Sequence, residues 1–227
     1  MLKHKYNSLF FDLDDTLLDY SFDEHRAVKE TLEEFGYECN EDVFELYETV
    51  QDWPSFEFGN INAETFLSSR FSRLLKALEV ESDRKKMISV FFGKILKYHK
   101  TVAGAKALIK SLYEKGYKLY LTTNGFSQVQ RARLKRSGFQ KYFSGVFISE
   151  EIDLRKPSKA FFDYVFNRIP ESNRRKVLII GDAQTADILG GYNAGMDTCW
   201  YNPHGKQGKY KATYSVRTLK SIEKILE

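Results

Sequence analysis

The amino-acid sequence predicts an α/β protein in which a parallel sheet carries helices on both faces and an all-helical segment follows the first strand. Three observations lead to this fold class. Strand-like and helix-like segments alternate from Val102 onward. Residues 177–180 form a continuous apolar run, which is typical of a strand buried on both faces. Residues 21–98 show only helical periods, although a strand-like segment, residues 5–12, precedes them.

The helical segment begins with a capping box, in which Ser21 is the N-cap and Glu24 stands three residues later. Four apolar stripes then recur at helical spacing. They are Val28, Leu32 and Phe35; Val43, Leu46, Tyr47 and Val50, started by Asn40; Leu67, Phe71, Leu74 and Leu78; and Met87, Phe91, Ile95 and Tyr98. We therefore expect a bundle of four short helices.

The alternating part predicts the remaining strands and the helices between them. The expected strands are 118–123, 146–148, 177–180 and 198–201, and the expected helices are 105–115, 128–137, 159–168, 186–194 and 219–226. Gly116, Gly138 and Gly195 are plausible stops for three of these helices. We expect two domains: residues 1–17 with 102–227 form the α/β core, and residues 18–101 form the helical insertion.

Composition narrows the class of protein. The chain has 227 residues, of which 42% are hydrophobic, so it can bury a sizeable core. Its 35 basic and 31 acidic residues give a formal charge of +4, spread along the chain as in a solvated, lysine-rich surface. No basic stretch interleaved with aromatics reaches the strength of a nucleic-acid-binding motif, and no run of ~18 apolar residues could span a bilayer. We expect neither a nucleic-acid polymer nor a membrane as partner.

Cysteine usage and the N-terminal segment predict a cytoplasmic location. Cys39 and Cys199 are too far apart in sequence to suggest a disulfide framework, and neither lies in a zinc-binding pattern. The apolar run near the N-terminus is short and turns acidic, unlike a signal peptide. We expect a cytoplasmic monomer or homodimer.

Acidic and hydroxyl-bearing residues follow three of the expected strands. These residues are Asp12, Asp14 and Thr16 after the first strand, Thr123, Asn124 and Gly125 after the second, and Gly181, Asp182 and Asp187 after residues 177–180. Ligands of open parallel sheets bind outside the carboxyl ends of the strands, so these residues mark one candidate site. Carboxylates so close together repel one another, and a partner must compensate them.

With these patterns the chain resembles the haloacid dehalogenase (HAD) superfamily of hydrolases. The four motifs of that family are matched by Asp12, Asp14 and Thr16 (DxDxT), by Thr123 at the end of an apolar strand, by Lys156 before Pro157, and by Gly181, Asp182 and Asp187 (GDxxxxD). The resemblance implies a Rossmann-like core, and the helical insertion is similar to the family's C1 cap. Residues 123–126, 148–151, 187–191 and 193–195 further resemble the YjjG-type nucleotidases.

The resemblance implies Mg²⁺ as cofactor, since this ion prefers oxygen ligands. Asp12 and Asp182 would supply side-chain oxygens, Asp14 its backbone carbonyl, and Asp187 an oxygen directly or through water. For Asp187 a second interpretation stays open, because an acid in the first turn of a helix is also favoured by the helix dipole.

The resemblance also implies the roles of the other site residues. Asp12 would be the nucleophile that forms an aspartyl phosphate, Asp14 the general acid and base, and Lys156 a cation that neutralises the phosphoryl group. Substrate-binding residues would be Thr123, Asn124, Gly125 and Thr16, the last also orienting the loop of Asp14. Asp153, Arg155 and Thr185 depart from the residues expected beside the motifs.

Substrate choice is expected from the helical insertion. The aromatic-rich segment 51–59 contains Trp53, which either stacks on a nucleobase or fills the small core of the insertion. The implied function is hydrolysis of small phosphate monoesters, above all nucleoside 5′-monophosphates.

Several alternatives remain at this stage. The same scaffold could act on another metabolite, such as a sugar phosphate or phosphoglycolate, or as a 2-haloacid dehalogenase. A dehalogenase needs neither a metal nor an acid two residues after its nucleophile, and Asp14 and Asp182 argue against it. A signalling receiver module is disfavoured because Asp12 follows the first strand, and a silent scaffold because the motifs are intact.

Overall fold

The computed structural model describes residues 5–50, 61 and 63–226. The chain divides into two compact units. One unit combines the chain up to Asp19 with the chain from His99 onward, and the other is Tyr20–Tyr98. Among the described residues, no helix is both long enough and apolar enough to cross a membrane.

Among its described residues, the unit Tyr20–Tyr98 is helical wherever its secondary structure is regular. Its described helices are α1 (Tyr20–Glu34), α2 (Glu41–Thr49), α4 (Ala63–Ala77) and α5 (Arg84–Ile95). The Asn40 side chain accepts a hydrogen bond of 3.0 Å from the backbone N–H of Val43 and so caps α2, as its sequence position predicts. The rings of Phe71 and Phe91 pack edge to face across α4 and α5.

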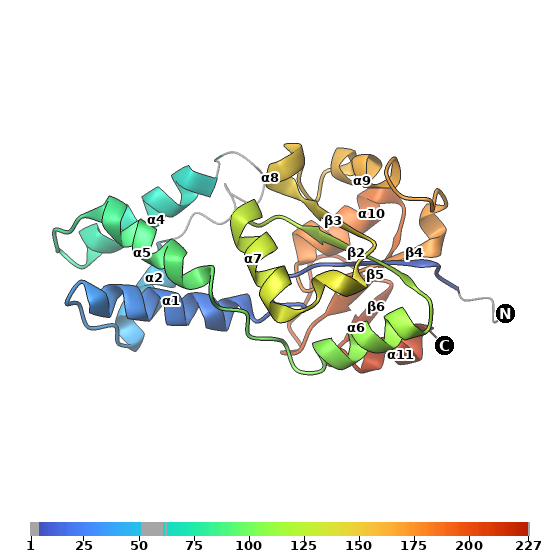
Figure 1. The fold of residues 1–227 in the computed structure, drawn as a ribbon, viewed down its shortest axis with the longest axis horizontal. Helices are drawn as coiled ribbons and strands as arrows, with labels where there is room; N and C mark the ends of the chain where they lie inside the picture. The colour runs from blue at the N-terminus through green and yellow to red at the C-terminus, as the bar shows by residue number, and fades with distance from the viewer. Residues whose placement is uncertain (1–4, 51–60, 62, 227) are drawn as a thin grey trace. The chain divides into compact units, whose positions relative to one another are not determined.

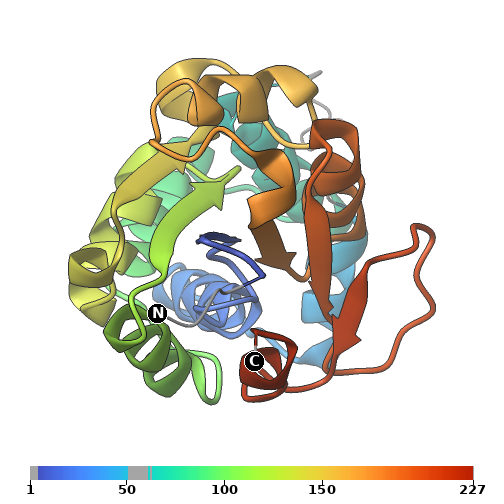
Figure 2. The same cartoon turned by 90° about the vertical axis from the view of Figure 1, so that its right-hand side faces the viewer.

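The other unit contains a six-stranded sheet in which every neighbouring pair of strands is parallel. Its strands are β1 (Ser8–Phe11), β2 (Lys118–Thr123), β3 (Gly145–Ile148), β4 (Val177–Gly181), β5 (Asp197–Tyr201) and β6 (Tyr214–Val216). Their order is β3-β2-β1-β4-β5-β6, so the first strand lies in the middle of the sheet. Figure 2 shows β1, in blue, between β2, in green, and β4, in orange.

Helices cover both faces of this sheet (Figure 1). They are α6 (Ala105–Glu114), α7 (Ser127–Ser137), α8 (Ser149–Ile152), α9 (Lys159–Phe166), α10 (Gly190–Ala194) and α11 (Ser221–Leu226). Successive side chains of β4 point to opposite faces. Leu178 and Ile180 pack with apolar residues of α6, α7 and α11, whereas Val177 and Ile179 pack with those of α9 and α10. Burial on both faces explains why β4 is a continuous apolar run.

The two segments that join the units pair with each other at the border of the core. The N–H of Val102 donates to the carbonyl of Leu17 (3.0 Å), and the N–H of Asp19 donates to the carbonyl of Lys100 (2.8 Å). The Lys100 ammonium lies 3.0 Å from the Asp19 carboxylate. The chain therefore leaves the core and returns to it at one place.

Several elements differ from the sequence prediction. Helix α1 begins at Tyr20, so Ser21 lies inside the helix and is not its N-cap. The short helix α8 was not predicted. The edge strand β6 was not predicted, because its three residues are too few for an apolar period. The expected helix 186–194 begins two residues earlier as a π-helix, Gln184–Leu189, which continues into α10. The wide first turn places Asp187 inside the unit, fully buried.

We predict that Gly191→Ala destabilises the protein by about 1–3 kcal/mol, because overpacking a close-packed core is unfavourable. A Cβ at this position would lie 2.5 Å from methyl groups of both Ile179 and Thr198. Gly93→Ala in α5 is the matched control, since its Cβ would meet no atom within 4 Å. The control should gain about 0.5–1 kcal/mol from helix propensity. Urea denaturation measures both, and equal stability of the two variants would contradict the packing argument.

Candidate active site

The site lies at the carboxyl edge of the sheet, where three neighbouring strands end. Asp12 follows β1, Thr123 ends β2, and Asp182 follows β4. β1 pairs in parallel with both β2 and β4, so these three positions share one edge. The sheet topology brings together residues that are far apart in sequence.

Three carboxylates form the centre of the site. One oxygen of Asp12, one of Asp182 and one of Asp187 all lie within 4.8 Å of one another. Asp12 is 7% exposed and Asp187 is 0% exposed. Such a cluster of hard oxygen donors has the chemistry that a magnesium ion prefers.

The ammonium of Lys156 lies between two of these carboxylates. Its Nζ donates to Oδ1 of Asp12 (2.7 Å) and to Oδ1 of Asp187 (2.6 Å), and the side chain is buried. The side chain of Asn124 fixes the backbone at this position: its Nδ2 donates to the carbonyl of Lys156 (2.8 Å), and its Oδ1 accepts from the N–H of Lys156 (3.0 Å). A residue after β2 thus places the cation beside residues that follow β1 and β4.

Burial controls the electrostatics of this cluster. Burial raises the pKa of Asp12 to about 8; Lys156 opposes the rise, and the charges of Asp187 and Asp14 add to it. Burial and the charge of Asp12 hold the pKa of Asp182 well above its ordinary value. For Lys156, burial acts to lower the pKa, but the carboxylates of Asp12 and Asp187 outweigh it and raise the pKa. The lysine is a permanent cation here.

Thr16 is fully buried and orients Asp182. Its Oγ1 donates to Oδ1 of Asp182 (3.1 Å) and accepts from the N–H of Asp182 (3.0 Å). The indole of Trp200 donates to the carbonyl of Asp182 (2.8 Å). Because these contacts of Thr16 go to Asp182, its substrate contact and its role toward the loop of Asp14 stay predictions.

Asp187 is held on both of its oxygens. Oδ1 accepts from Lys156, and Oδ2 accepts from the N–H of Ala183 (3.1 Å). Asp187 lies in the first turn of the π-helix Gln184–Leu189 and also within the carboxylate cluster, so its position agrees with both interpretations.

Two residues that the sequence analysis did not single out, Gln130 and Arg133, contact Asp14. Both lie on α7 and are buried. Arg133 pairs with Oδ1 of Asp14, and Gln130 donates to Oδ2 of Asp14 (2.6 Å) and to Oγ1 of Thr123 (2.7 Å). Their signal in the sequence was weak but present, since they are polar residues on the helix face that also carries Val129 and Leu134.

The charges of the site do not balance within it. If all groups are ionised, Asp12, Asp14, Asp182 and Asp187 carry four negative charges and Lys156 and Arg133 carry two positive charges. The difference, 4 − 2, leaves two negative charges, which one divalent cation would neutralise. Desolvated like charges are unfavourable, so the residues present fit such an ion.

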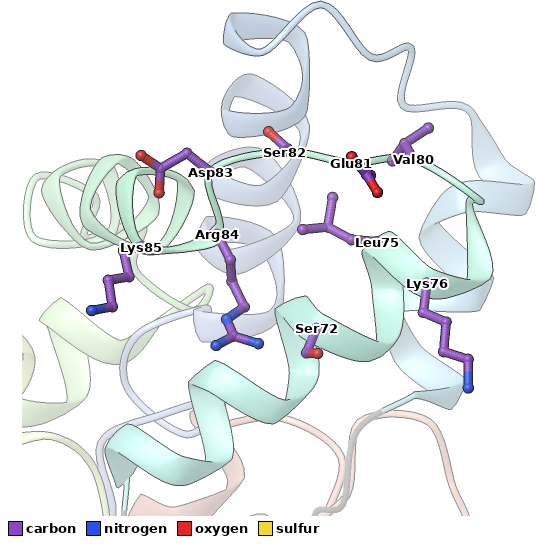
Figure 3. Close-up of a pocket in the computed structure, with 9 residues that line it drawn as sticks. All are labelled: Ser72, Leu75, Lys76, Val80, Glu81, Ser82, Asp83, Arg84 and Lys85. Carbon is purple, nitrogen blue, oxygen red and sulfur yellow. The ribbon is translucent and has the colours of Figure 1, made fainter.

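The helical unit contributes no described residue to the predicted site. Trp53 lies outside the described residues, so its role stays a prediction. A hollow of about 560 Å³ beside α4 and the start of α5 mixes apolar side chains, Leu75 and Val80, with the charged Lys76 and Arg84 (Figure 3). None of the predicted site residues lines it.

Comparison with known proteins gives a consistent picture. The family model of haloacid dehalogenase-like hydrolases matches residues 9–201. The pyrimidine 5′-nucleotidase PynA of Streptococcus pneumoniae is 36% identical over 96% of this chain and 93% of its own length. The pyrimidine 5′-nucleotidase YjjG of Escherichia coli is 31% identical over 98% of both chains. A magnesium-bound crystal structure of the HAD-hydrolase YfnB of Bacillus subtilis matches with a TM-score of 0.92 and 38% identity, over 98% of this chain and 99% of that one.

We predict that Mg²⁺ raises the melting temperature, and raises it more at pH 8 than at pH 6. The folded pKa of Asp12, about 8, lies above its ordinary value of 3.8. The metal-free protein therefore loses stability as pH rises between these values, and protons compete with the cation below about pH 8. Thermal melts with Mg²⁺ or EDTA measure the shift.

The same melts test the ligands. Asp182→Asn should reduce the Mg²⁺-dependent shift, whereas Asp163→Asn, which changes a surface carboxylate paired with Lys159 and Arg174, should keep it. A wild-type protein that Mg²⁺ does not stabilise at either pH would contradict the metal site.

We predict that Lys156→Met destabilises the metal-free protein at pH 8 by about 3–5 kcal/mol, because it leaves buried carboxylates without their cation. Lys159→Met is the matched control: this exposed lysine pairs with Asp163 on the same helix surface. The control should lose no more than about 1 kcal/mol. Urea denaturation in EDTA compares the two, and equal losses would show that Lys156 does not compensate the cluster.

Proposed function

The chain belongs to the haloacid dehalogenase-like hydrolases, and we propose that it is a Mg²⁺-dependent phosphatase that hydrolyses nucleoside 5′-monophosphates. The observation that carries the proposal is the position of Asp12. It directly follows β1, contacts Lys156 and lies beside two further carboxylates, with Asp14 two residues later. The nucleotide class is supported by PynA and YjjG, both pyrimidine 5′-nucleotidases that match nearly the whole chain.

We propose that Asp12, Asp182 and the backbone carbonyl of Asp14 hold the Mg²⁺ ion, with Asp187 acting directly or through water. The carboxylate cluster and its two uncompensated charges support this assignment, as does the magnesium in the structure of YfnB. When bound, the ion stabilises negative charge on the transferring phosphoryl group.

The reaction proceeds in two steps on the side chains of the site. An oxygen of Asp12 attacks phosphorus, the bond from phosphorus to the leaving oxygen breaks, and Asp14 gives its proton to the leaving alcohol. Asp14 then takes a proton from a water molecule, which attacks the aspartyl phosphate and frees Asp12. Lys156 neutralises charge on the phosphoryl oxygens in both steps.

Residues after β2 receive the phosphate in this proposal. The hydroxyl of Thr123 and the backbone N–H groups of Asn124 and Gly125 would donate to its oxygens. Thr123 ends β2, which pairs in parallel with β1, the strand that Asp12 follows, and this placement supports the role.

The phosphatase mechanism uses Asp14 and Asp182, whereas a dehalogenase needs neither. A 2-haloacid dehalogenase needs the nucleophile, but neither a metal nor a proton donor at Asp14. Here Asp182 is held by Thr16 beside Asp12, and Asp14 is held by two buried side chains. These arrangements favour phosphoryl transfer.

We assign the unit Tyr20–Tyr98 the role of a cap that selects the substrate and excludes water from the core site. Within it, Trp53 is our candidate for stacking on the nucleobase. Both cysteines are free thiols, which agrees with a cytoplasmic enzyme acting on a small phosphorylated metabolite.

We predict phosphate release from nucleoside 5′-monophosphates in the presence of Mg²⁺, and loss of this activity in EDTA. Asp12→Asn should reduce turnover to the limit of detection, because the amide is no nucleophile. A panel that includes sugar phosphates and phosphoglycolate measures the preference among esters.

Asp15→Asn is the control for this experiment. Asp15 adopts a left-handed backbone conformation with φ +55°, which asparagine also tolerates, and it should keep activity within a few fold. No release from any ester, or release indifferent to EDTA, would contradict the proposed function. A preference for a sugar phosphate would keep the mechanism and correct the substrate.

A further inference from the structure

Helix α7 carries two polar side chains on its buried face. Gln130 is 1% exposed and Arg133 is 0% exposed, and both lie between the apolar residues Val129 and Leu134. A buried guanidinium is unfavourable unless it is paired, so its position needs a reason beyond packing.

Both side chains are directed at the carboxylate of Asp14. Arg133 Nη1 donates to Oδ1 of Asp14, and Gln130 Nε2 donates to Oδ2 of the same carboxylate at 2.6 Å. Each oxygen therefore accepts a hydrogen bond from α7 and still has a lone pair for a proton. The carboxylate plane is fixed at two points, by a helix that belongs to the same unit.

Gln130 also connects Asp14 to Thr123. Its Nε2 donates to Oγ1 of Thr123 at 2.7 Å, so this hydroxyl accepts from Gln130 and keeps its own proton for another acceptor. Gly125 provides the space for the amide group, because a Cβ there would lie 2.3 Å from Nε2 of Gln130. The Thr-Asn-Gly segment after β2 is thus shaped around the side chain of Gln130.

We propose that Arg133 and Gln130 are positioning residues that hold the Asp14 carboxylate in the orientation in which it accepts a proton from the attacking water. The proposal rests on the proposed phosphatase function. In this step the water oxygen bonds to phosphorus, the bond between phosphorus and Asp12 breaks, and the water proton passes to Asp14. Neither α7 residue gives or takes the transferred proton, and both act through their hydrogen bonds to Asp14.

Comparing the rate of the first turnover with the steady-state rate distinguishes a loss of Asp14 positioning from a general disruption of the site. p-Nitrophenyl phosphate has a good leaving group, so release of nitrophenol in the first turnover needs little help from a general acid. Hydrolysis of the aspartyl phosphate still needs the base. For Arg133→Met we expect near wild-type nitrophenol release in the first turnover, and steady-state phosphate release lowered by about ten-fold or more, within the range that general acid–base groups contribute.

Arg131→Met is the matched control. Arg131 lies on the same helix, but it pairs with Glu151 at the surface (2.6 Å) and does not contact Asp14 in any described interaction. This variant should match wild type in both phases. Mg²⁺ binding by calorimetry should also be unchanged in Arg133→Met, because the carboxylate cluster is left in place.

Three further variants complete the test. Gln130→Met should also keep a near wild-type first turnover and slow the steady-state release of phosphate. It replaces Arg133→Met in the test if that variant does not fold. In an Asp14→Asn background, Arg133→Met should add no further loss, because its effect passes through Asp14. Arg133→Lys should recover part of the steady-state rate by restoring the positive charge.

The outcomes are distinct. Equal slowing of both phases would make α7 merely structural and overturn the proposal, as would wild-type rates in both phases or an additive loss in the Asp14→Asn background. A wild-type protein that hydrolyses neither p-nitrophenyl phosphate nor any nucleoside 5′-monophosphate or other ester of the panel would instead overturn the proposed phosphatase function itself.

Discussion

The contact of the Lys156 ammonium with two buried carboxylates is the interaction on which the site depends. Asp12 and Asp187 come from different segments, and both would be unfavourable at this depth without a cation. The surrounding hydrogen bonds place that cation, above all the double contact between Asn124 and the backbone of Lys156. The lysine compensates only part of the negative charge, and the remainder makes the site receptive to a divalent cation.

The parallel sheet makes this arrangement possible. β1 pairs with β2 and β4, so Asp12, the proposed nucleophile after the first strand, has the proposed phosphate-binding residues on one side and the carboxylates of the proposed metal site on the other. The packed faces of the sheet leave these groups little freedom. Rigid placement matters because phosphoryl transfer depends mainly on orientation and on charge already in position.

The longer strands and the acidic residues that follow them could be predicted from the sequence. A strand buried on both faces is a continuous apolar run, and polar residues mark its end. The edge strand β6 is too short for such a pattern. Gln130 and Arg133 were missed because helical periodicity identifies a buried face but not its partners, and Asp14 lies 116 and 119 positions away. The contacts of Thr16 with Asp182 were missed for the same reason, since 166 positions separate them.

The two chain segments that join the units pair with each other at the border of the core, and this pairing affects how the protein can change in evolution. The backbone bonds between Leu17 and Val102 and between Asp19 and Lys100 bring the two ends of a long insertion together. A short turn could join these ends and leave every strand of the sheet in register, as in sites that tolerate domain insertion. The helical unit is in this sense an exchangeable module. If it selects the substrate, as we propose, its replacement would change the substrate and leave the carboxyl edge of the sheet unaltered.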